Sequence, residues 1–285
     1  MLNDKSVLVK GAGDFASGTI RRLYLAGCKV VATELERPLT VRRKVAFSEA
    51  IYEGKITVEG VTAVRTTKES IDRVHKKGKV AVIVDPEGSI LKERRFDIVV
   101  DARSAKKNLG TKKNEAKIVI GIGPGFTAGK DCHAVVESLA GHDLGRVYYK
   151  GKAAENTGKP APTDYYLLAC SLSPCCVGID PESLVIRAPR EGIFTAKREI
   201  GDIVEKGDIL GIIEDTNVVA KEKGVIRGLI HDGVKVEKGL KIGDIDPTCI
   251  KERCFTISEK SNAIAGGVLE ACLHLSLKLL NKKRR

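Results

Sequence analysis

A glycine-rich turn between an apolar strand and an amphipathic helix most constrains the fold of this 285-residue chain. Ser6 to Lys10 is short and apolar, and apolar positions at helical spacing follow the turn Gly11-Ala12-Gly13-Asp14-Phe15. A second apolar segment, Lys29 to Thr33, ends at Glu34, about 20 residues after the glycines. Glycines let a backbone approach a pyrophosphate, and an acid at that distance accepts ribose hydroxyls. The pattern predicts a Rossmann-like nucleotide-binding unit; a tight turn that binds nothing is the alternative.

Glu34 favours an unphosphorylated ribose, because a carboxylate repels a 2'-phosphate. Three nearby arginines, Arg37, Arg42 and Arg43, offer charges for a further phosphate. The identity of the nucleotide therefore stays open, with NAD as one alternative.

Three further apolar segments, Val80 to Val84, Asp97 to Val100 and Lys117 to Ile122, suit a parallel sheet covered on both faces. Between the strands we expect a helix over Pro38 to Ile51, a hairpin over Lys55 to Arg65 and a helix over Glu69 to His75. Ligands gather at the carboxyl ends of such strands, where Asp85 and Asp101 also lie. For both aspartates a turn-forming or capping role is favoured over ligand binding.

A second glycine-rich loop follows the last of these strands. It departs from a P-loop, because Pro124 stands where the first glycine belongs and Asp131 where a hydroxyl belongs. We expect Gly123-Pro124-Gly125-Phe126-Thr127 to offer backbone amides to an anion, with Phe126 either stacking on a ring or buried in the core. Asp131 and His133 are candidates for acid–base chemistry; alternatively, His133 packs near the start of a helix over Ala134 to Leu139.

The carboxyl-terminal half contains an internal repeat at an offset of 32, which relates Gly192 to Gly211 with Gly224 to Gly243. Short apolar pieces between regular glycines predict two interlocked sets of short strands, similar to a biotinyl or lipoyl barrel-sandwich domain. In carrier domains a lysine stands at the hairpin tip, where this chain has Asn217. We therefore expect a non-carrier barrel-sandwich without biotin or lipoate.

The overall charge is +12, but acids and bases are interspersed, as on an ordinary solvated surface. Six tyrosines, six phenylalanines and no tryptophan provide few stacking groups for nucleic acid, so a phosphorylated small molecule is the favoured anionic ligand. No apolar run reaches the roughly 18 to 20 residues needed to span a bilayer, so we expect that the chain is not an integral membrane protein. The eight cysteines are scattered and form no C-x-x-C pair, which favours buried or free thiols over a zinc site. Because the sequence also shows no signal peptide, we expect a protein of the reducing cytoplasm.

These features divide the chain into four parts. Residues 1–150 form the predicted nucleotide-binding domain, 151–185 a connecting segment and 186–247 the barrel-sandwich domain. Residues 248–285 form a final segment whose helix, Ser261 to Leu280, returns to the first domain. The predicted class is thus α/β, with a Rossmann-like parallel-sheet domain and a small all-β domain.

With these motifs in place, the chain resembles the YqeB family, whose members are associated with selenium-dependent molybdenum hydroxylases and are distantly similar to XdhC-type maturation factors. The resemblance runs from about residue 6 to residue 272, and GIGPGFTAG, Gly121 to Gly129, is its most specific piece. It also rests on Val9 to Ala16, Thr33 to Glu36, Arg42-Arg43, Glu53-Gly54, Val84 to Pro86, Asn108 to Thr111, Gly145 to Val147, Asn156 to Gly158, Gly243 to Pro247 and Phe255 to Ser258.

The resemblance implies an accessory role in preparing or inserting a molybdopterin cofactor, with the dinucleotide form as one option and a molybdenum hydroxylase as partner. Two alternatives stay open. One is an NAD-dependent oxidoreductase, for which no hydride-transfer site can be assigned, and the other is a non-catalytic interaction scaffold. The sequence leaves open whether the chain is an enzyme and whether it forms a homo-oligomer.

Overall fold

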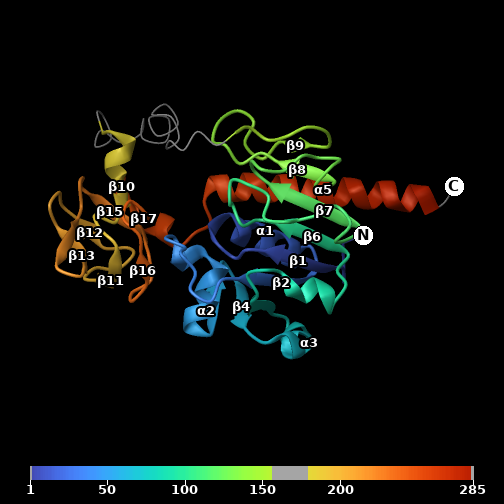
Figure 1. The fold of residues 1–285 in the computed structure, drawn as a ribbon, viewed down its shortest axis with the longest axis horizontal. Helices are drawn as coiled ribbons and strands as arrows, with labels where there is room; N and C mark the ends of the chain where they lie inside the picture. Colours follow the sequence, from blue (N-terminus) through green and yellow to red (C-terminus); the bar gives the residue numbers. More distant parts are fainter. Residues whose placement is uncertain (1, 156–178, 284–285) are drawn as a thin grey trace. The chain divides into compact units, whose positions relative to one another are not determined.

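The computed structural model describes residues 2–155 and 179–283, which form two compact units (Figure 1). Unit 1 comprises Met1–Pro38, Ala46–Thr157 and Ile257–Arg285. Unit 2 comprises Leu39–Val45 and Gly158–Thr256. The chain therefore enters unit 2 briefly near residue 40 before it completes unit 1.

Unit 1 is built on a nine-stranded sheet of order β3-β4-β5-β2-β1-β6-β7-β8-β9. From β4 to β8 all neighbouring strands are parallel, whereas β3 and β9 join the two edges in antiparallel orientation. The strands are β1 (Ser6–Lys10), β2 (Lys29–Glu34), β3 (Lys55–Val58), β4 (Val61–Arg65), β5 (Val80–Val84), β6 (Ile98–Asp101), β7 (Ile118–Ile122), β8 (Ala134–Val136) and β9 (Val147–Tyr148).

The predicted Rossmann-like parallel sheet was therefore wrong, because the sheet is mixed. Buried apolar runs reveal that a strand is covered on both faces, but they do not encode its direction at an edge. At one edge Glu59 and Gly60 have φ of 42° and 83°, a tight turn that folds β3 back on β4. The hairpin over Lys55 to Arg65 is thus confirmed, and so are the other predicted strands of this unit.

The helices of unit 1 are few. Among the described residues they are α1 (Asp14–Leu25), α2 (Ala50–Glu53), α3 (Ile71–Lys76) and α5 (Glu259–Lys283). Unit 1 also contains the short 3-10 turns η2 (Phe47–Glu49), η3 (Lys68–Ser70) and η4 (Ser89–Lys92), whereas η1 (Arg43–Val45) lies in unit 2. The continuous helix predicted over Pro38 to Ile51 is wrong. Its backbone bonds elsewhere: the Ser48 amide donates to the Ala12 carbonyl, and the Phe47 amide donates to Ser17 Oγ.

Helix α5 packs lengthwise against α1. Ser261 Oγ donates to the Asp14 carbonyl at 2.8 Å, and a Cβ on Gly18 would lie 2.5 Å from Ser261 Oγ, so the two helices meet at a glycine. By length and composition α5 could also cross a membrane, with a mean hydropathy of 1.5 over a window that is 33% buried. The sequence-based expectation missed this, but one such helix is weak evidence, because core helices have the same composition.

Unit 2 consists of two four-stranded antiparallel sheets, of order β10-β17-β15-β12 and β14-β13-β11-β16. The short strands of the two repeat halves interlock, since β12 pairs with β15 and β11 pairs with β16. The strands are β10 (Val185–Arg187), β11 (Gly192–Ala196), β12 (Ile203–Val204), β13 (Ile209–Ile213), β14 (Thr216–Val219), β15 (Gly224–Leu229), β16 (Lys235–Val236) and β17 (Lys241–Asp246), with 3-10 turns η6 (Pro181–Leu184) and η7 (Lys251–Cys254).

The assignment of this unit as a barrel-sandwich domain is corrected to a pair of antiparallel sheets, and the unit also includes Leu39–Val45 from the other half of the sequence. Arg42 holds that segment in place through Asp244, with Nε and Nη2 each 3.2 Å from Oδ2. Burial alone would raise the pKa of Asp244, but the charges of Arg42 and Lys241 outweigh it and lower the pKa far below its usual range. The repeat within residues 192–243 could not predict this contact, because Arg42 lies far away in the sequence.

Candidate functional site

The carboxyl ends of β2, β1, β6 and β7 lie side by side in unit 1. Lys10 at the end of β1 is in register with Thr33 of β2 and with Asp101 of β6, and Asp101 is in register with Gly121 of β7. The sheet therefore brings the first glycine loop, Glu34, Asp101 and the start of the second glycine loop to one edge, as the sequence predicts.

The first glycine loop is fixed by backbone bonds. Gly11 has a φ of 95°, its amide donates to the Thr33 carbonyl, and a Cβ there would lie 3.2 Å from the Ala102 carbonyl oxygen. Glycine is required at this position, because a side chain would be strained and crowded. Gly13 then forms the N-cap of α1 in extended conformation and, as a glycine, has no side chain that could accept a helix amide. The amino-terminal turn of α1 thus opens at the carboxyl edge of the sheet.

Glu34 reaches across to this loop. Its Oε2 accepts the Ala12 amide at 2.8 Å, and its Oε1 accepts the Leu35 amide at 2.8 Å. Burial raises the pKa of Glu34, and the two amide hydrogen bonds only partly oppose that shift. The carboxylate is thus in place beside the glycines, where an acid would meet ribose hydroxyls.

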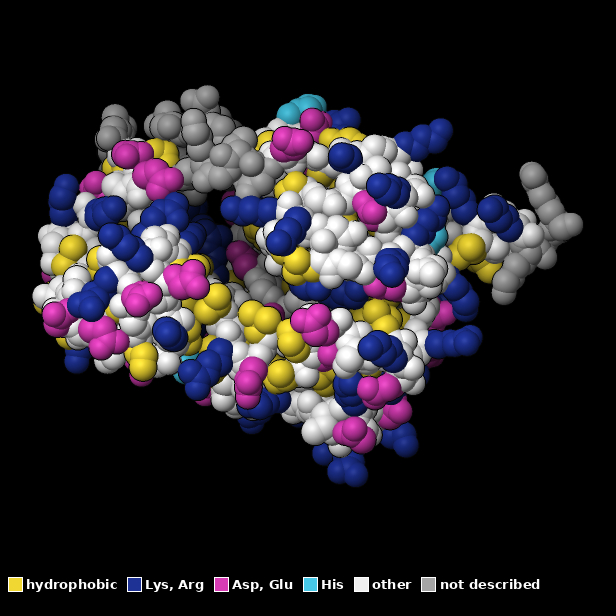
Figure 2. Space-filling view, viewed as in Figure 1, with side chains coloured by type: hydrophobic (Ala, Val, Ile, Leu, Met, Phe, Trp, Pro, Cys, Tyr) yellow, Lys and Arg dark blue, Asp and Glu magenta, His cyan; other side chains and the backbone are white. Residues whose placement is uncertain are grey.

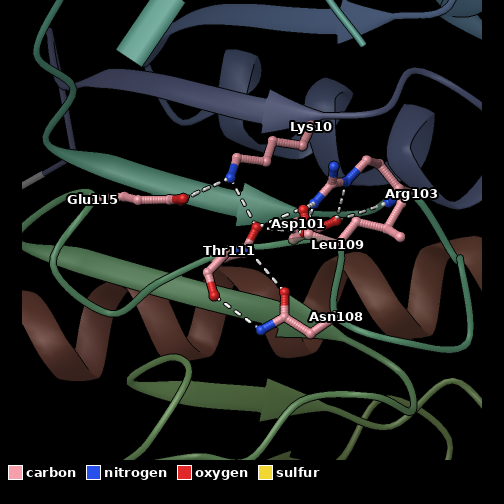
Figure 3. A network of polar contacts seen from close by, with 7 residues as sticks. All are labelled: Lys10, Asp101, Arg103, Asn108, Leu109, Thr111 and Glu115. Atoms are coloured by element: carbon pink, nitrogen blue, oxygen red, sulfur yellow. Dashed lines mark hydrogen bonds and ion pairs between the residues drawn. The ribbon is translucent and has the colours of Figure 1, made fainter. Parts of the chain in front are cut away.

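A network of buried polar groups lies beneath the loop that follows β6 (Figure 3). Lys10 Nζ donates to Thr111 Oγ1 at 2.8 Å and forms an ion pair with Glu115 at 2.8 Å. Thr111 Oγ1 in turn donates to Asp101 Oδ2 at 2.6 Å, and Arg103 binds both Asp101 oxygens. Asn108 closes the loop through the Thr111 amide and carbonyl.

This network fixes the shape of the loop over residues 102–111. Burial alone would raise the pKa of Asp101, but hydrogen bonds and charge from Arg103, together with Thr111, outweigh it and lower the pKa. Lys106 and Lys107 are exposed on the same loop. Asp101 accepts the Arg103 amide at 3.2 Å, which agrees with the favoured turn-forming role, and it is also the centre of a pre-organised ion-pair network beside the glycines.

The second glycine loop is packed more tightly. Phe126 is 5% exposed and belongs to the core, and a Cβ on Gly121 would lie 2.5 Å from its ring. Gly125 has a φ of 98° and approaches the Lys107 backbone, where a Cβ would be 2.6 Å away. Of the two alternatives for Phe126, core packing is the one that the structure shows. Pro124 and Thr127 are half-buried.

Asp131 and His133 lie away from the carboxyl edge. Asp131 Oδ2 accepts the Thr127 amide at 2.8 Å and closes a turn. His133 precedes β8, and its Nδ1 accepts the Val119 amide near the start of β7. Burial lowers the pKa of His133, and Lys113 lowers it further. The segment after His133 is a strand, not the alternative helix, and the structure does not bring this pair to the glycine loops.

Two groups of residues were missed from the sequence. Lys10, Thr111 and Glu115 carry the network, and only the polar end of an otherwise apolar strand at Lys10 hinted at it. Glu137, 2% exposed after β8, accepts three backbone amides, from Ser138, Leu139 and Ala154. Asp85, in contrast, caps η4 through the Ser89 and Ile90 amides, which confirms the favoured capping role.

Among the described residues, the cysteines Cys28, Cys132, Cys254 and Cys272 are buried thiols, which agrees with the interpretation of the cysteines as structural. Burial raises the pKa of Cys132 to about 11, so this thiol is protonated at neutral pH. Cys170, Cys175 and Cys176, and the resemblance at Asn156 to Gly158, lie outside the described residues. Asn217 lies within β14, beside the turn where a carrier lysine would stand.

Charged side chains of both signs alternate over the visible surface of each unit, as expected from the interspersed sequence (Figure 2). No large region of that face carries one sign alone. The loop after β6 adds two exposed basic side chains, Lys106 and Lys107.

Comparison with solved structures identifies only distant likenesses. Three of these are an aspartoacylase family protein from Mesorhizobium loti (8% identity, TM-score 0.25), a succinylglutamate desuccinylase/aspartoacylase from Rhodobacter sphaeroides (15%, 0.25) and the product-bound ectoine utilization protein EutE from Ruegeria pomeroyi (11%, 0.24). Each match covers 85% of both chains. None of these three is named as a Rossmann-type protein or a molybdenum-enzyme maturation factor, which the sequence led us to expect, and TM-scores this low assign no activity.

No protein-family model matches the chain. It is 44% identical over 270 residues to the uncharacterized protein YqeB of Escherichia coli strain K12. The alignment covers 94% of this chain and 47% of YqeB, so the chain spans about half the length of the curated relative that it matches. The chain is therefore a homologue of YqeB and a member of the YqeB family.

Proposed function

We propose that unit 1 binds a phosphorylated small molecule that contains a nucleotide, at the carboxyl edge of its sheet. The observation that carries this proposal is the uncapped amino terminus of α1 at Gly13, flanked by Glu34 and by the loop of Arg103. A helix of 12 residues directs backbone amides and the positive end of its dipole toward that edge. Phosphate oxygens are the natural acceptors for such amides.

The surrounding groups fit the rest of a nucleotide. Glu34 is held beside the loop as an acceptor for ribose hydroxyls, and Lys106 and Lys107 add positive charge for a second phosphate. Because the Lys10 and Asp101 network already fixes the loop, little ordering is needed on binding.

The role we propose for this site is that of an accessory protein of a selenium-dependent molybdenum hydroxylase, which holds a nucleotide or a molybdopterin dinucleotide for transfer. The chain is a member of the YqeB family, and the resemblance to that family, which implies an association with selenium-dependent molybdenum hydroxylases, supports this role. A binding role also suits the geometry, because Asp131 and His133, the acid–base candidates, lie away from the proposed ligand.

Calorimetric titration of the purified chain with NAD, NADP, CTP and molybdopterin dinucleotide tests the proposal. We expect saturable binding of the molybdopterin dinucleotide. Saturation by NAD alone would overturn the accessory role in favour of an NAD-dependent oxidoreductase. Absence of binding by all four compounds would indicate a scaffold whose glycines are structural.

The variant Gly13→Asp tests whether the ligand binds at the amino terminus of α1. Asp is a preferred N-cap residue and the extended backbone of Gly13, with φ −69°, accommodates it, so stability should be retained. The new carboxylate faces the bound phosphate, and we expect affinity to fall about tenfold or more, since like charges repel at short range. Gly13→Asn is the matched neutral control. Equal affinities of the two variants would place the phosphate elsewhere.

A further inference from the structure

The loop after β6 has an unusual backbone between its anchored ends. Ser104 and Lys106 have φ of 55° and 61°, in the left-handed region that residues other than glycine seldom adopt. Arg103, Ala105 and Lys107 have negative φ, so the sign of φ alternates along the stretch. Such alternation is typical of an anion-binding nest, in which successive backbone amides turn toward one concave side.

The amides of this stretch are not used inside the protein. Among the residues that the structure describes, no group accepts a hydrogen bond from the amides of residues 104–107. The amide that precedes them is satisfied, because Arg103 donates to Asp101 Oδ1. Since unpaired N–H groups need water or a ligand as acceptor, these adjacent amides are available to one anion.

The protein holds the loop in this conformation from inside. The Arg103 guanidinium is directed at the Asp101 carboxylate, and Asn108 fixes the far end through Thr111 (Figure 3). The Lys107 backbone packs against Gly125, where a Cβ would lie 2.6 Å from the Lys107 Cα. Uncommon backbone conformations that the surrounding structure fixes in this way are found at ligand clamps.

The charge of the loop favours an anion as its ligand. Arg103 is neutralised by Asp101, but Lys106 and Lys107 are exposed, and neither forms an ion pair with a described residue. Backbone amides together with ammonium groups are donors without acceptors, and phosphate oxygens suit them.

This stretch lies beside the first glycine loop. A Cβ on Gly11 would lie 3.2 Å from the Arg103 Cα, so the two backbones touch. Because Ser104 follows Arg103, its Cα lies within about 9 Å of the Gly11 Cα. Gly13, at the amino terminus of α1, is only two residues from Gly11. The amides of residues 104–107 and the first amides of α1 are therefore within reach of one ligand that carries two phosphates.

We propose that residues 104–107 form a second phosphate subsite, so that the ligand of unit 1 carries a diphosphate. The amino terminus of α1 binds one phosphate, and the loop amides with Lys106 bind the other. This inference rests on the proposed function and narrows its ligand class, because a nucleoside monophosphate would fill only one of the two subsites.

Titration of the full chain with inorganic pyrophosphate and with inorganic phosphate, at equal ionic strength, tests the proposal. We expect pyrophosphate to bind at least about tenfold more tightly. Two variants then test the backbone: Ser104→Gly keeps the left-handed conformation without strain, whereas the β-branched side chain of Ser104→Val opposes it. Pyrophosphate should bind Ser104→Val at least about tenfold more weakly than Ser104→Gly.

Neither substitution at Ser104 changes the charge of the chain. Equal affinities of these two variants for pyrophosphate would therefore mean that the lysines alone attract the ion, and would overturn the proposal. Equal affinities of the unaltered chain for phosphate and pyrophosphate would overturn it as well.

A second pair of variants keeps the test valid if Ser104→Val does not fold. Lys106→Asp and Lys106→Asn both tolerate a left-handed backbone and differ only in charge. Pyrophosphate should bind Lys106→Asp at least about fivefold more weakly than Lys106→Asn, because like charges repel. Equal affinities here would contradict the subsite. Thermal unfolding verifies that each variant folds.

Nucleotide titration separates this inference from the proposed function. Saturable binding of a nucleotide by a chain that does not distinguish pyrophosphate from phosphate would overturn the second subsite alone. Preference for pyrophosphate without binding of any nucleotide would overturn the nucleotide and support the pair of anion subsites.

Discussion

Two glycine-rich loops follow the parallel strands β1 and β7 of unit 1, which are separated by β6, and they differ in what comes next. The first loop, Gly11 to Phe15, runs directly into α1. The second loop, Gly123 to Thr127, contains the core residue Phe126 and is followed by a closed turn. Both loops use glycines with positive φ, 95° at Gly11 and 78° at Gly123. From composition alone they are equivalent candidates for an anion.

The difference lies in how their backbone amides are used. In the second loop the Gly123 amide donates to the Val136 carbonyl, the Thr127 amide to Asp131 and the Ala128 amide to the Gly151 carbonyl. In the first loop the Gly11 amide donates to the Thr33 carbonyl and the Ala12 amide to Glu34, but the chain then enters α1, whose N-cap residue Gly13 has no side chain to accept the first helix amides. Glycines permit a tight turn in both places, but only a following helix leaves amides directed at a ligand. We therefore place the proposed phosphate at the first loop.

The largest expected effect on stability is the difference between alanine substitutions at the phenylalanines of the two loops. Phe126→Ala removes a core ring and should lower the free energy of unfolding by about 3–5 kcal/mol. Phe15→Ala should cost clearly less, because Phe15 is half-buried, with Lys260 Nζ 4.9 Å from its ring centre. Urea unfolding of both variants measures the difference. Equal losses would contradict the view that only the second loop is part of the core.

Features of the two loops that depend on residues close in sequence could be predicted, whereas those that depend on distant residues could not. Strand, turn and helix at Ser6 to Leu25 follow from local periodicity and were predicted correctly. Phe126 could not be assigned, because its burial depends on Gly121 across the turn and on the core around it. The bonds of Lys10 with Thr111 and Glu115 join residues about a hundred positions apart, and no local pattern encodes them.

The edges of the sheet were mispredicted for a similar reason. An apolar run such as β8 records burial, while the direction of its neighbour β9 depends on how the chain returns. In unit 2 the repeat predicted short interlocked strands, but not the bond from Arg42 to Asp244, 202 residues away. Site residues at strand ends were therefore more predictable than the partners that hold them.

The second prediction concerns the loop after β6, which contacts both glycine loops. Asp101→Asn keeps the shape of the side chain but removes the charge that holds Arg103, and should cost about 2 kcal/mol at neutral pH. The pKa of Asp101 is lowered in the folded protein, so its stabilisation is present above the unfolded pKa of about 3.9 and is lost as pH falls through the folded pKa. The difference between variant and unaltered protein should therefore shrink between pH 6 and pH 3, as measured by urea midpoints. A constant difference would mean that the charge is not the cause.

The third prediction concerns the turn that closes the second loop. Asp131→Ala leaves the Thr127 amide without its acceptor and should destabilise by about 1 kcal/mol. Asp131→Asn retains an oxygen acceptor and serves as the control. Nucleotide affinity should be unchanged in both variants. A selective loss of affinity would show that the second loop, too, contacts the ligand.

The smallest expected effect on stability comes from Glu34→Gln. This variant is also the most direct test of ligand binding at the first loop. Burial raises the pKa of Glu34, with the Leu35 and Ala12 amides opposing it, so ionisation at neutral pH costs folding free energy. For a raised pKa, stability is lost as pH rises through the folded value, and glutamine removes that loss. Its amide oxygen still accepts the Ala12 amide, but its NH2 group cannot accept the Leu35 amide, and this loss offsets the gain. We therefore expect thermal stability at pH 8 to change by less than about 0.5 kcal/mol. Affinity for a nucleotide should nevertheless fall about fivefold, because ribose hydroxyls lose a charged acceptor. At a binding residue, affinity should thus fall with little change in stability, whereas at the structural second loop only stability should change.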